Sequence, residues 1–104
     1  MNKYIIVTTL CAKEEIANKI INTLLAKKLV AGSQISKVHS RYWWNNKIEE
    51  SDEYKIEFRT KESLLNEIKN EINKVHDYEL AEISSCEINN LSQEFINWIE
   101  INTK

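Results

Sequence analysis

Residues 34–59 read QISKVHSRYWWNNKIEESDEYKIEFR, and over most of this stretch apolar and polar residues alternate. Alternation with a period of two is typical of a β-strand that has one buried and one solvated face. The pair Asn45-Asn46 interrupts the pattern with two residues that tolerate positive φ, which favours a tight turn. We therefore expect a long central hairpin whose arms hold roughly ten or more residues, against about 5–6 in an ordinary strand.

The two arms of this hairpin differ in how regular the alternation is. In the first arm, Ile35 has the opposite parity to Val38 and Trp44, which predicts a β-bulge near Ser36-Lys37. In the return arm, one face carries apolar residues: Ile48, Tyr54, Ile56 and Phe58. The other face carries charged residues, which we expect to be solvated: Glu49, Glu53, Lys55, Glu57 and Arg59.

A strand-like and a helix-like segment precede the hairpin. Residues 4–9, YIIVTT, are the β-branched and aromatic types found in a buried strand. Residues 13–31 carry apolar residues at the spacing of an amphipathic helix. Gly32, the only glycine of the chain, follows this helix, and we expect it to end the helix in a left-handed conformation.

Helical and strand-like patterns also follow the hairpin. They predict a second helix after Thr60, a strand over about 79–88 and a short helix over about 92–101. The order β-α-β-β-α-β plus a C-terminal helix predicts an α+β, ferredoxin-like fold, an antiparallel sheet with two helices on one face. Since no segment has the composition of a linker, we expect one domain over residues 1–104.

The tip of the hairpin is rich in aromatic residues. Tyr42, Trp43 and Trp44 would give a monomer a large exposed apolar patch, which soluble monomers avoid. We therefore predict that the hairpin contacts neighbouring subunits and that these three residues form an oligomer interface. The alternative is that the arms are shorter and the aromatic residues fold back onto the helices.

The composition excludes several classes of protein. One glycine and no proline exclude glycine-rich phosphate loops, nucleophile elbows and dinucleotide fingerprints. With 14 basic and 16 acidic residues, the chain lacks the basic excess of a nucleic-acid binder. The apolar run over residues 4–7 is far shorter than the roughly 20 residues that span a bilayer. Because no signal-peptide pattern is present either, we expect a cytoplasmic protein with no membrane partner.

Several blocks of sequence occur in an order that indicates a known family. They are Val7-Thr8-Thr9, Leu29-Val30-Ala31, Tyr42-Trp43-Trp44, Lys47-Ile48-Glu49-Glu50, His76-Asp77-Tyr78-Glu79, Glu82-Ile83 and Phe95-Ile96-Asn97-Trp98. Together they resemble the CutA family of divalent-ion-tolerance proteins. The resemblance implies a homotrimer of ferredoxin-like subunits that binds copper or another divalent cation in metal tolerance or homeostasis, with no cofactor required for folding.

Residues at one end of the expected fold suit this metal chemistry. In the ferredoxin-like topology the first strand and the second helix end on the same side of the sheet, so Cys11, His76 and Glu79 are expected together. A thiolate, an imidazole and a carboxylate suit copper or zinc, and we predict a metal site there. The alternative is that His76 is an exposed histidine at a helix end. His39 is expected to be a half-exposed strand residue.

A second candidate site lies beside the first. We place Tyr78, Glu79 and Glu82 in a cleft between subunits, because the family resemblance is concentrated there and a neighbour's hairpin could reach it. A carboxylate in such a cleft could bind a cationic group. The alternative is that the three residues only fix the start of the fourth strand by hydrogen bonds.

Catalysis is not expected, since no oxyanion donor or orienting residue accompanies a possible pairing of Cys11 with His76. The sequence therefore predicts a CutA-like homotrimer that binds divalent metal ions. The alternative from another class is a signal-transducing trimer that resembles the PII proteins and binds a small ligand in clefts between subunits. A third is a structural trimer that anchors a partner.

Overall fold

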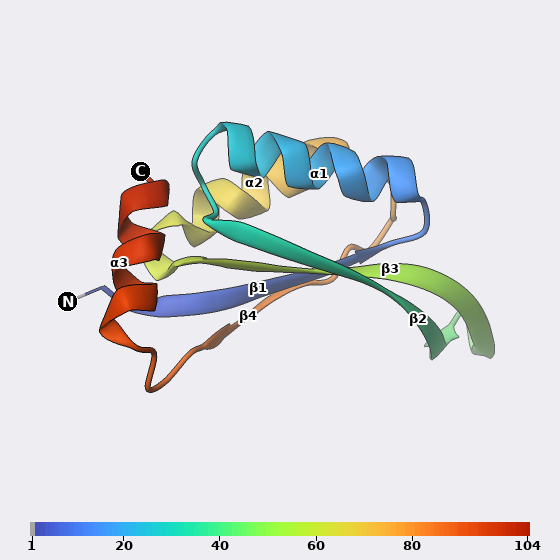
Figure 1. The fold of residues 1–104 in the computed structure, drawn as a ribbon. Helices are drawn as coiled ribbons and strands as arrows, with labels where there is room; N and C mark the ends of the chain where they lie inside the picture. The colour runs from blue at the N-terminus through green and yellow to red at the C-terminus, as the bar shows by residue number, and fades with distance from the viewer. Residues whose placement is uncertain (1) are drawn as a thin grey trace.

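A computed structural model describes residues 2–104 of the chain, and Figure 1 shows its elements. The strands are β1 (Tyr4–Cys11), β2 (Gly32–Trp44), β3 (Lys47–Lys61) and β4 (Ile83–Glu87). The helices are α1 (Glu14–Ala26), α2 (Leu65–Val75) and α3 (Gln93–Asn102), and a short 3₁₀ turn, Glu62–Leu64, precedes α2. This order confirms the predicted α+β arrangement with its additional C-terminal helix.

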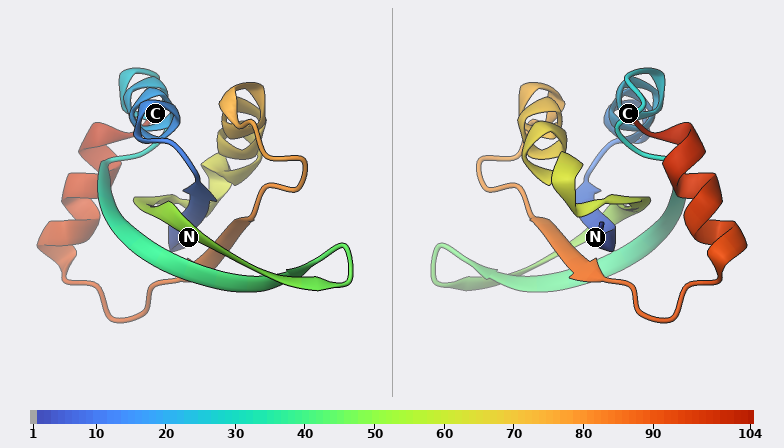
Figure 2. Two further views of the ribbon diagram at one scale, coloured as in Figure 1. Left: turned by 90° about the vertical axis from the view of Figure 1, so that its right-hand side faces the viewer. Right: turned by 90° about the vertical axis from the view of Figure 1, so that its left-hand side faces the viewer.

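The four strands form one sheet in the order β2-β3-β1-β4, with every neighbouring pair antiparallel. In Figure 2, α1 and α2 lie side by side over one face of this sheet, and α3 lies outside that layer. Within residues 2–104, every helix is too short or too polar to cross a membrane.

The core lies between the sheet and the two covering helices. Alternate residues of β1 are buried, beginning with Ile5 and Val7, which is the period-two pattern of a strand with one covered face. Ile56 and Phe58 of β3 bury their side chains in the same cluster, together with Ile68 and other apolar residues of the helices.

The β2–β3 hairpin extends well past the helices (Figure 1). Its pairing is continuous from Gly32↔Arg59 to Trp44↔Lys47, so the bulge that we predicted near Ser36-Lys37 is wrong. Ile35 lies directly opposite Ile56 in this pairing and is 43% exposed. Its opposite parity to Val38 and Trp44 therefore comes from an apolar side chain at the uncovered edge of the sheet. No residue is inserted in the strand.

The turn of the hairpin agrees with the sequence prediction. Asn45 and Asn46 have φ values of 52° and 64°, which is the left-handed geometry that matches the twist of a two-residue hairpin. The arms are long, and Tyr42, Trp43 and Trp44 remain 42%, 72% and 37% exposed in the single chain. The aromatic residues therefore do not fold back onto the helices.

The end of α1 corrects another prediction. The helix ends at Ala26, and the left-handed residue is Lys28 with φ 56°, whereas Gly32 has no positive φ. The N–H groups of Lys28 and Leu29 donate to the carbonyls of Leu25 and Leu24 at 3.1 and 3.0 Å, which is a Schellman motif. A lysine thus occupies the position where we expected glycine, and the apolar residues after it extended the apparent helical pattern.

Gly32 has a packing role at the start of β2. A Cβ atom added there would lie 2.8 Å from Cη2 of Trp98, closer than carbon atoms pack. The missing side chain therefore lets α3 approach the edge of the sheet.

Replacing Gly32 by alanine is expected to destabilise the protein by about 1–3 kcal/mol, the usual range for overpacking. In a Trp98→Phe background the smaller ring removes the contact, and the same change should cost much less. Urea unfolding of the double-mutant cycle measures this coupling. Additive effects of the two substitutions would contradict the proposed role.

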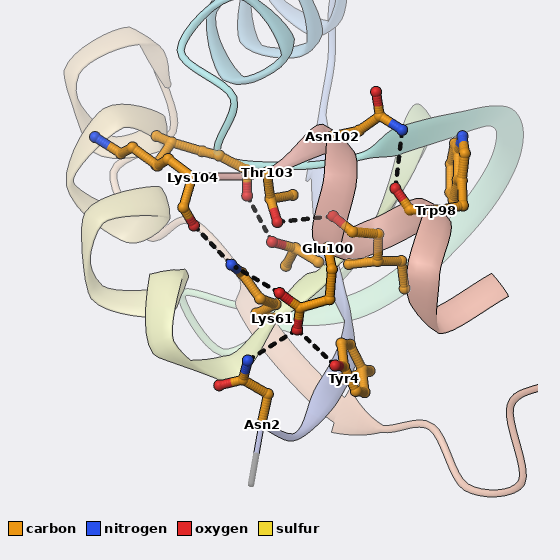
Figure 3. A network of polar contacts seen from close by, with 11 residues as sticks. Asn2, Tyr4, Lys61, Trp98, Glu100, Asn102, Thr103 and Lys104 are labelled. Atoms are coloured by element: carbon orange, nitrogen blue, oxygen red, sulfur yellow. Dashed lines mark hydrogen bonds and ion pairs between the residues drawn. The ribbon is translucent and has the colours of Figure 1, made fainter. Parts of the chain in front are cut away.

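A polar network fastens α3 to the end of the sheet (Figure 3). The Glu100 carboxylate accepts hydrogen bonds from the Tyr4 hydroxyl at 2.6 Å and from the Asn2 amide at 2.8 Å. The Lys61 ammonium lies 3.5 Å from the same carboxylate and donates to the Lys104 carbonyl at 2.7 Å. These contacts, that of Tyr4 above all, lower the pKa of Glu100.

Candidate functional site

The candidate site is a hollow of about 720 Å³ between the hairpin and the segment that leads into β4. Its apolar wall consists of Leu10, Tyr42, Trp43, Trp44, Leu80 and Ile83. Its acidic lining consists of Glu53, Glu79 and Glu82. The aromatic residues predicted for an oligomer interface and the residues predicted for a cleft therefore share one hollow within a single subunit.

Tyr78 and Glu53 form the buried polar contact of this hollow. The Tyr78 hydroxyl donates to Oε2 of Glu53 at 2.7 Å, and Glu53 is only 8% exposed. Burial raises the pKa of Tyr78, and the hydrogen bond to the Glu53 carboxylate raises it further. The phenol therefore stays protonated at neutral pH and remains a donor to Glu53.

Two contacts with β1 hold the loop between α2 and β4 in place. At one end, Nε2 of His76 donates to the Leu10 carbonyl at 2.6 Å, while Nδ1 accepts the N–H of Tyr78 at 3.2 Å. At the other end, the Thr9 hydroxyl donates to the Glu82 carbonyl at 2.7 Å. These bonds orient Tyr78 toward Glu53, and they fix the rotation of the His76 ring, with Nε2 toward Leu10 and Nδ1 toward the N–H of Tyr78.

The predicted metal ligands lie at the same end of the sheet but point into different surroundings. Cys11 is fully buried, and its thiol donates weakly to the Lys13 carbonyl at 3.6 Å. Burial raises the pKa of this thiol, and the nearby charges of Asp77 and Glu53 also raise it. Glu79 is exposed and lines the hollow. Across residues 2–104, no group of three or more His, Cys, Asp and Glu side chains is placed to hold a metal ion.

The remaining histidine belongs to the hairpin. His39 has a half-exposed side chain, as expected, and its two ring nitrogens lie 2.8 Å from Asp52 and 2.9 Å from Glu50. These hydrogen bonds, with Glu50 first, raise the pKa of His39. Arg41 also donates to Glu50 at 2.8 Å, so charged residues pair across the strands on this part of the hairpin.

The burial of Glu53 does not follow from the sequence pattern. The alternating pattern assigned this residue to a solvated face, but the loop that carries Tyr78 covers it. The two residues are 25 positions apart, and no local pattern connects them. The only signal in the sequence was that the family resemblance includes the block containing Tyr78.

Comparisons with known proteins agree with this architecture. The family model described as "CutA1 divalent ion tolerance protein" matches residues 5–102. A Pyrococcus horikoshii protein named divalent-cation tolerance protein CutA is 32% identical over 100 residues, covering 96% of this chain and 98% of the relative. A Thermotoga maritima protein of the same name is 33% identical, covering 91% of this chain and 94% of the relative.

A solved structure gives the same result for the fold. The crystal structure of CutA1 from Pyrococcus horikoshii matches with a TM-score of 0.91 and 31% identity, over 96% of this chain and 98% of that one. Both the sequence and the fold therefore match along nearly the whole chain. The chain belongs to the CutA1 family of divalent-ion-tolerance proteins.

Proposed function

We propose that this protein is a homotrimer that binds divalent metal ions of the copper type and acts in metal-ion tolerance. The observation that carries the proposal is the family match over residues 5–102, together with relatives that are named for divalent-cation tolerance. The protein acts by binding and not by catalysis in this proposal.

The hairpin supports assembly into an oligomer. Trp43 and its cross-strand partner Ile48 are 72% and 64% exposed, and Leu80, across the hollow, is 73% exposed. Contact with other subunits would remove this apolar surface from water, which is the main favourable contribution to protein association.

The proposed cation ligands are His76, Cys11 and Glu79. His76 lies beside the end of β1, because its ring bonds to Leu10, the residue before Cys11. A metal ion could bind Nδ1 only by displacing the N–H of Tyr78, and the Cys11 thiol would have to lose its proton in a buried position. Both steps cost free energy, so we propose weak binding.

Replacing His76 by alanine is expected to weaken Cu²⁺ and Zn²⁺ binding at least about tenfold, since metal-site partners commonly contribute 10–100-fold in affinity. Isothermal titration calorimetry on the purified, metal-free protein measures the change. His39→Ala is the matched control, because it removes the other histidine of the described chain from a site on the hairpin. Loss of binding in His39→Ala but not in His76→Ala would move the site to the hairpin and contradict the proposal.

The hollow favours a second candidate function. A volume of about 720 Å³ is within the range of small-molecule sites, which are clefts of roughly 300–1,000 Å³. The protein would then be a signal-transducing trimer comparable to the PII proteins. A thermal-shift screen with metals, nucleotides and small ions separates the two, because metal tolerance requires a saturable shift that a chelator reverses.

A further inference from the structure

His39 lies at the centre of a charged cluster on the overhanging part of the β2–β3 hairpin. Asp52 is its direct partner across the strands, and Nδ1 of the ring lies 2.8 Å from Oδ1 of that carboxylate. Glu50 lies diagonally opposite, with its Oε1 atom 2.9 Å from Nε2 of the ring. Both nitrogens of one imidazole therefore face carboxylate oxygens, and both contacts lie within a single hairpin.

This arrangement requires the charged form of the ring. An ionised carboxylate only accepts hydrogen bonds, and a neutral imidazole has one N–H, so only the imidazolium can donate to both partners. Glu50 stays ionised at neutral pH, because hydrogen bonds from His39 and Arg41 lower the pKa of its carboxyl group. Arg41 donates through Nε to the same oxygen of Glu50 at 2.8 Å. The imidazolium thus links two acidic residues of β3 to β2.

Charged groups from both strands surround His39. Those that share its face of the hairpin or line the shallow hollow beside it are Lys37, Arg41, Glu50, Asp52 and Glu53. The connection between β1 and α1 also reaches this hollow, but of its residues only Ala12 lines it. Glu53 belongs to the opposite face of the sheet and accepts the hydrogen bond of Tyr78.

The two carboxylates that contact the ring dominate its titration. The Lys37 ammonium lies over the Tyr54 ring, 5.8 Å from its centroid, and Arg41 is bound to Glu50, so both cations are engaged with other groups. The hydrogen bonds to Glu50 and then Asp52 raise the pKa of His39 above its ordinary value.

Loss of the ring proton to solvent removes one of the two contacts. A neutral ring keeps a single N–H, so its other nitrogen presents a lone pair to a carboxylate oxygen. Because the pKa of His39 is raised in the fold, the stabilisation is complete below the ordinary histidine value of about 6.5 and is lost as the pH rises through the raised pKa.

We propose that His39 is a pH-dependent clamp of the hairpin, whose imidazolium holds Glu50 and Asp52 across the strands and whose deprotonation releases one of them. The clamp acts on the element that we expect to contact neighbouring subunits, so the strand pairing of that element depends on pH near neutrality. Its contacts are internal to one hairpin and require no exposed surface. The proposal goes beyond metal tolerance and does not rest on metal binding.

An NMR titration of the histidine ring resonances tests the clamp on the full-length protein with EDTA present. The chain has two histidines, so His39→Gln assigns both sets of signals. The midpoint of His39 should lie above the ordinary value of about 6.5. In about 1 M salt it should move back toward that value, because ions screen half-exposed charge pairs. An ordinary midpoint at low salt would overturn the proposal, whether or not any variant folds.

Two variants separate the contact from the net charge of the hairpin. Glu50→Gln removes a carboxylate that contacts the ring and should lower the midpoint of His39. Glu49→Gln makes the same change of charge one residue away, on the opposite face of β3, where Glu49 pairs with Tyr42. This control should move the midpoint much less. Equal shifts in the two variants would show that net charge sets the titration and would contradict the clamp.

Amide hydrogen exchange measures whether the clamp acts on the strands. Below the midpoint, amides over residues 49–53 should exchange about two- to fivefold faster in His39→Gln than in the wild-type protein at the same pH, as for half-exposed ion pairs. Above the midpoint the difference should vanish, because the wild-type ring is then neutral and, like glutamine, has no charge.

Two results of the exchange experiment would overturn the proposal. One is a difference between the proteins that is the same on both sides of the midpoint, which would reflect packing of the ring and not its charge. The other is equal exchange at every pH, which would mean that the contacts do not hold the strands together. Because EDTA removes divalent ions, neither result bears on the metal titration.

Discussion

Replacing Phe58 by alanine is expected to lower the free energy of unfolding by about 3–5 kcal/mol, the usual cost of removing a buried aromatic ring. Phe58 is completely buried, and so is Val7, its partner across the β1–β3 pair. The ring belongs to the cluster that joins the sheet to α1 and α2. Close packing on all sides leaves the neighbours little room to fill the resulting cavity.

The chain offers a matched control in Phe95→Ala. This is the other phenylalanine of the sequence, on α3, and it is 37% exposed with its ring centroid 5.0 Å from that of Trp98. Its loss should cost about 1 kcal/mol, the value of a partly exposed aromatic pair. Urea unfolding at one fixed protein concentration compares the two variants, since assembly makes apparent stability depend on concentration. Equal losses of unfolding free energy in the two variants would contradict the placement of Phe58 inside the core and of Phe95 outside it.

Replacing Trp43 by glutamate is expected to convert the proposed trimer into monomers. In an interface, the new carboxylate would be buried beside apolar side chains without a partner, which costs several kcal/mol for each subunit. The position itself is exposed in the subunit, so the fold should be retained. Multi-angle light scattering should show the mass falling to that of one 12.3 kDa chain, while circular dichroism stays unchanged.

Asn70→Glu serves as the control for that experiment. Asn70 is an exposed residue of α2, far from the hairpin in the sequence, and the change adds the same negative charge. This variant should assemble like the wild-type protein. Two outcomes would remove the hairpin tip from the proposed interface. One is a wild-type protein that is monomeric at micromolar concentration, and the other is a Trp43→Glu variant that stays trimeric.

Much of the fold is predictable from periodicity alone. Period-two alternation located both hairpin arms, and the Asn45-Asn46 turn follows from the conformational tolerance of asparagine. The wrong predictions concern Gly32 and Ile35, because glycine and isoleucine each occur in proteins for more than one structural reason. Gly32 relieves a contact with Trp98 that depends on how α3 packs, and Ile35 is apolar at an edge that the helices leave uncovered. Neither fact is encoded in the neighbouring sequence.

The candidate site was predictable only in part, for a related reason. Topology placed His76 near the end of the first strand, and the structure confirms that location through the bond to Leu10. The orientation of the imidazole, with both nitrogens engaged, depends on side-chain rotation that no spacing pattern records. The burial of Glu53 depends on a long-range contact with Tyr78, so alternation alone assigned it to the wrong environment.

The overhang of the hairpin gives β3 two ends with different local stability. The half that contains Ile56 and Phe58 opens only with the whole core, whereas residues 47–50 are all exposed. Separating the strands at the tip therefore exposes little new apolar surface and requires a smaller free energy than global unfolding. A subunit or ligand that covers the tip would therefore suppress this local opening directly, whereas it would stabilise the core only through the shared equilibrium with the unfolded chain.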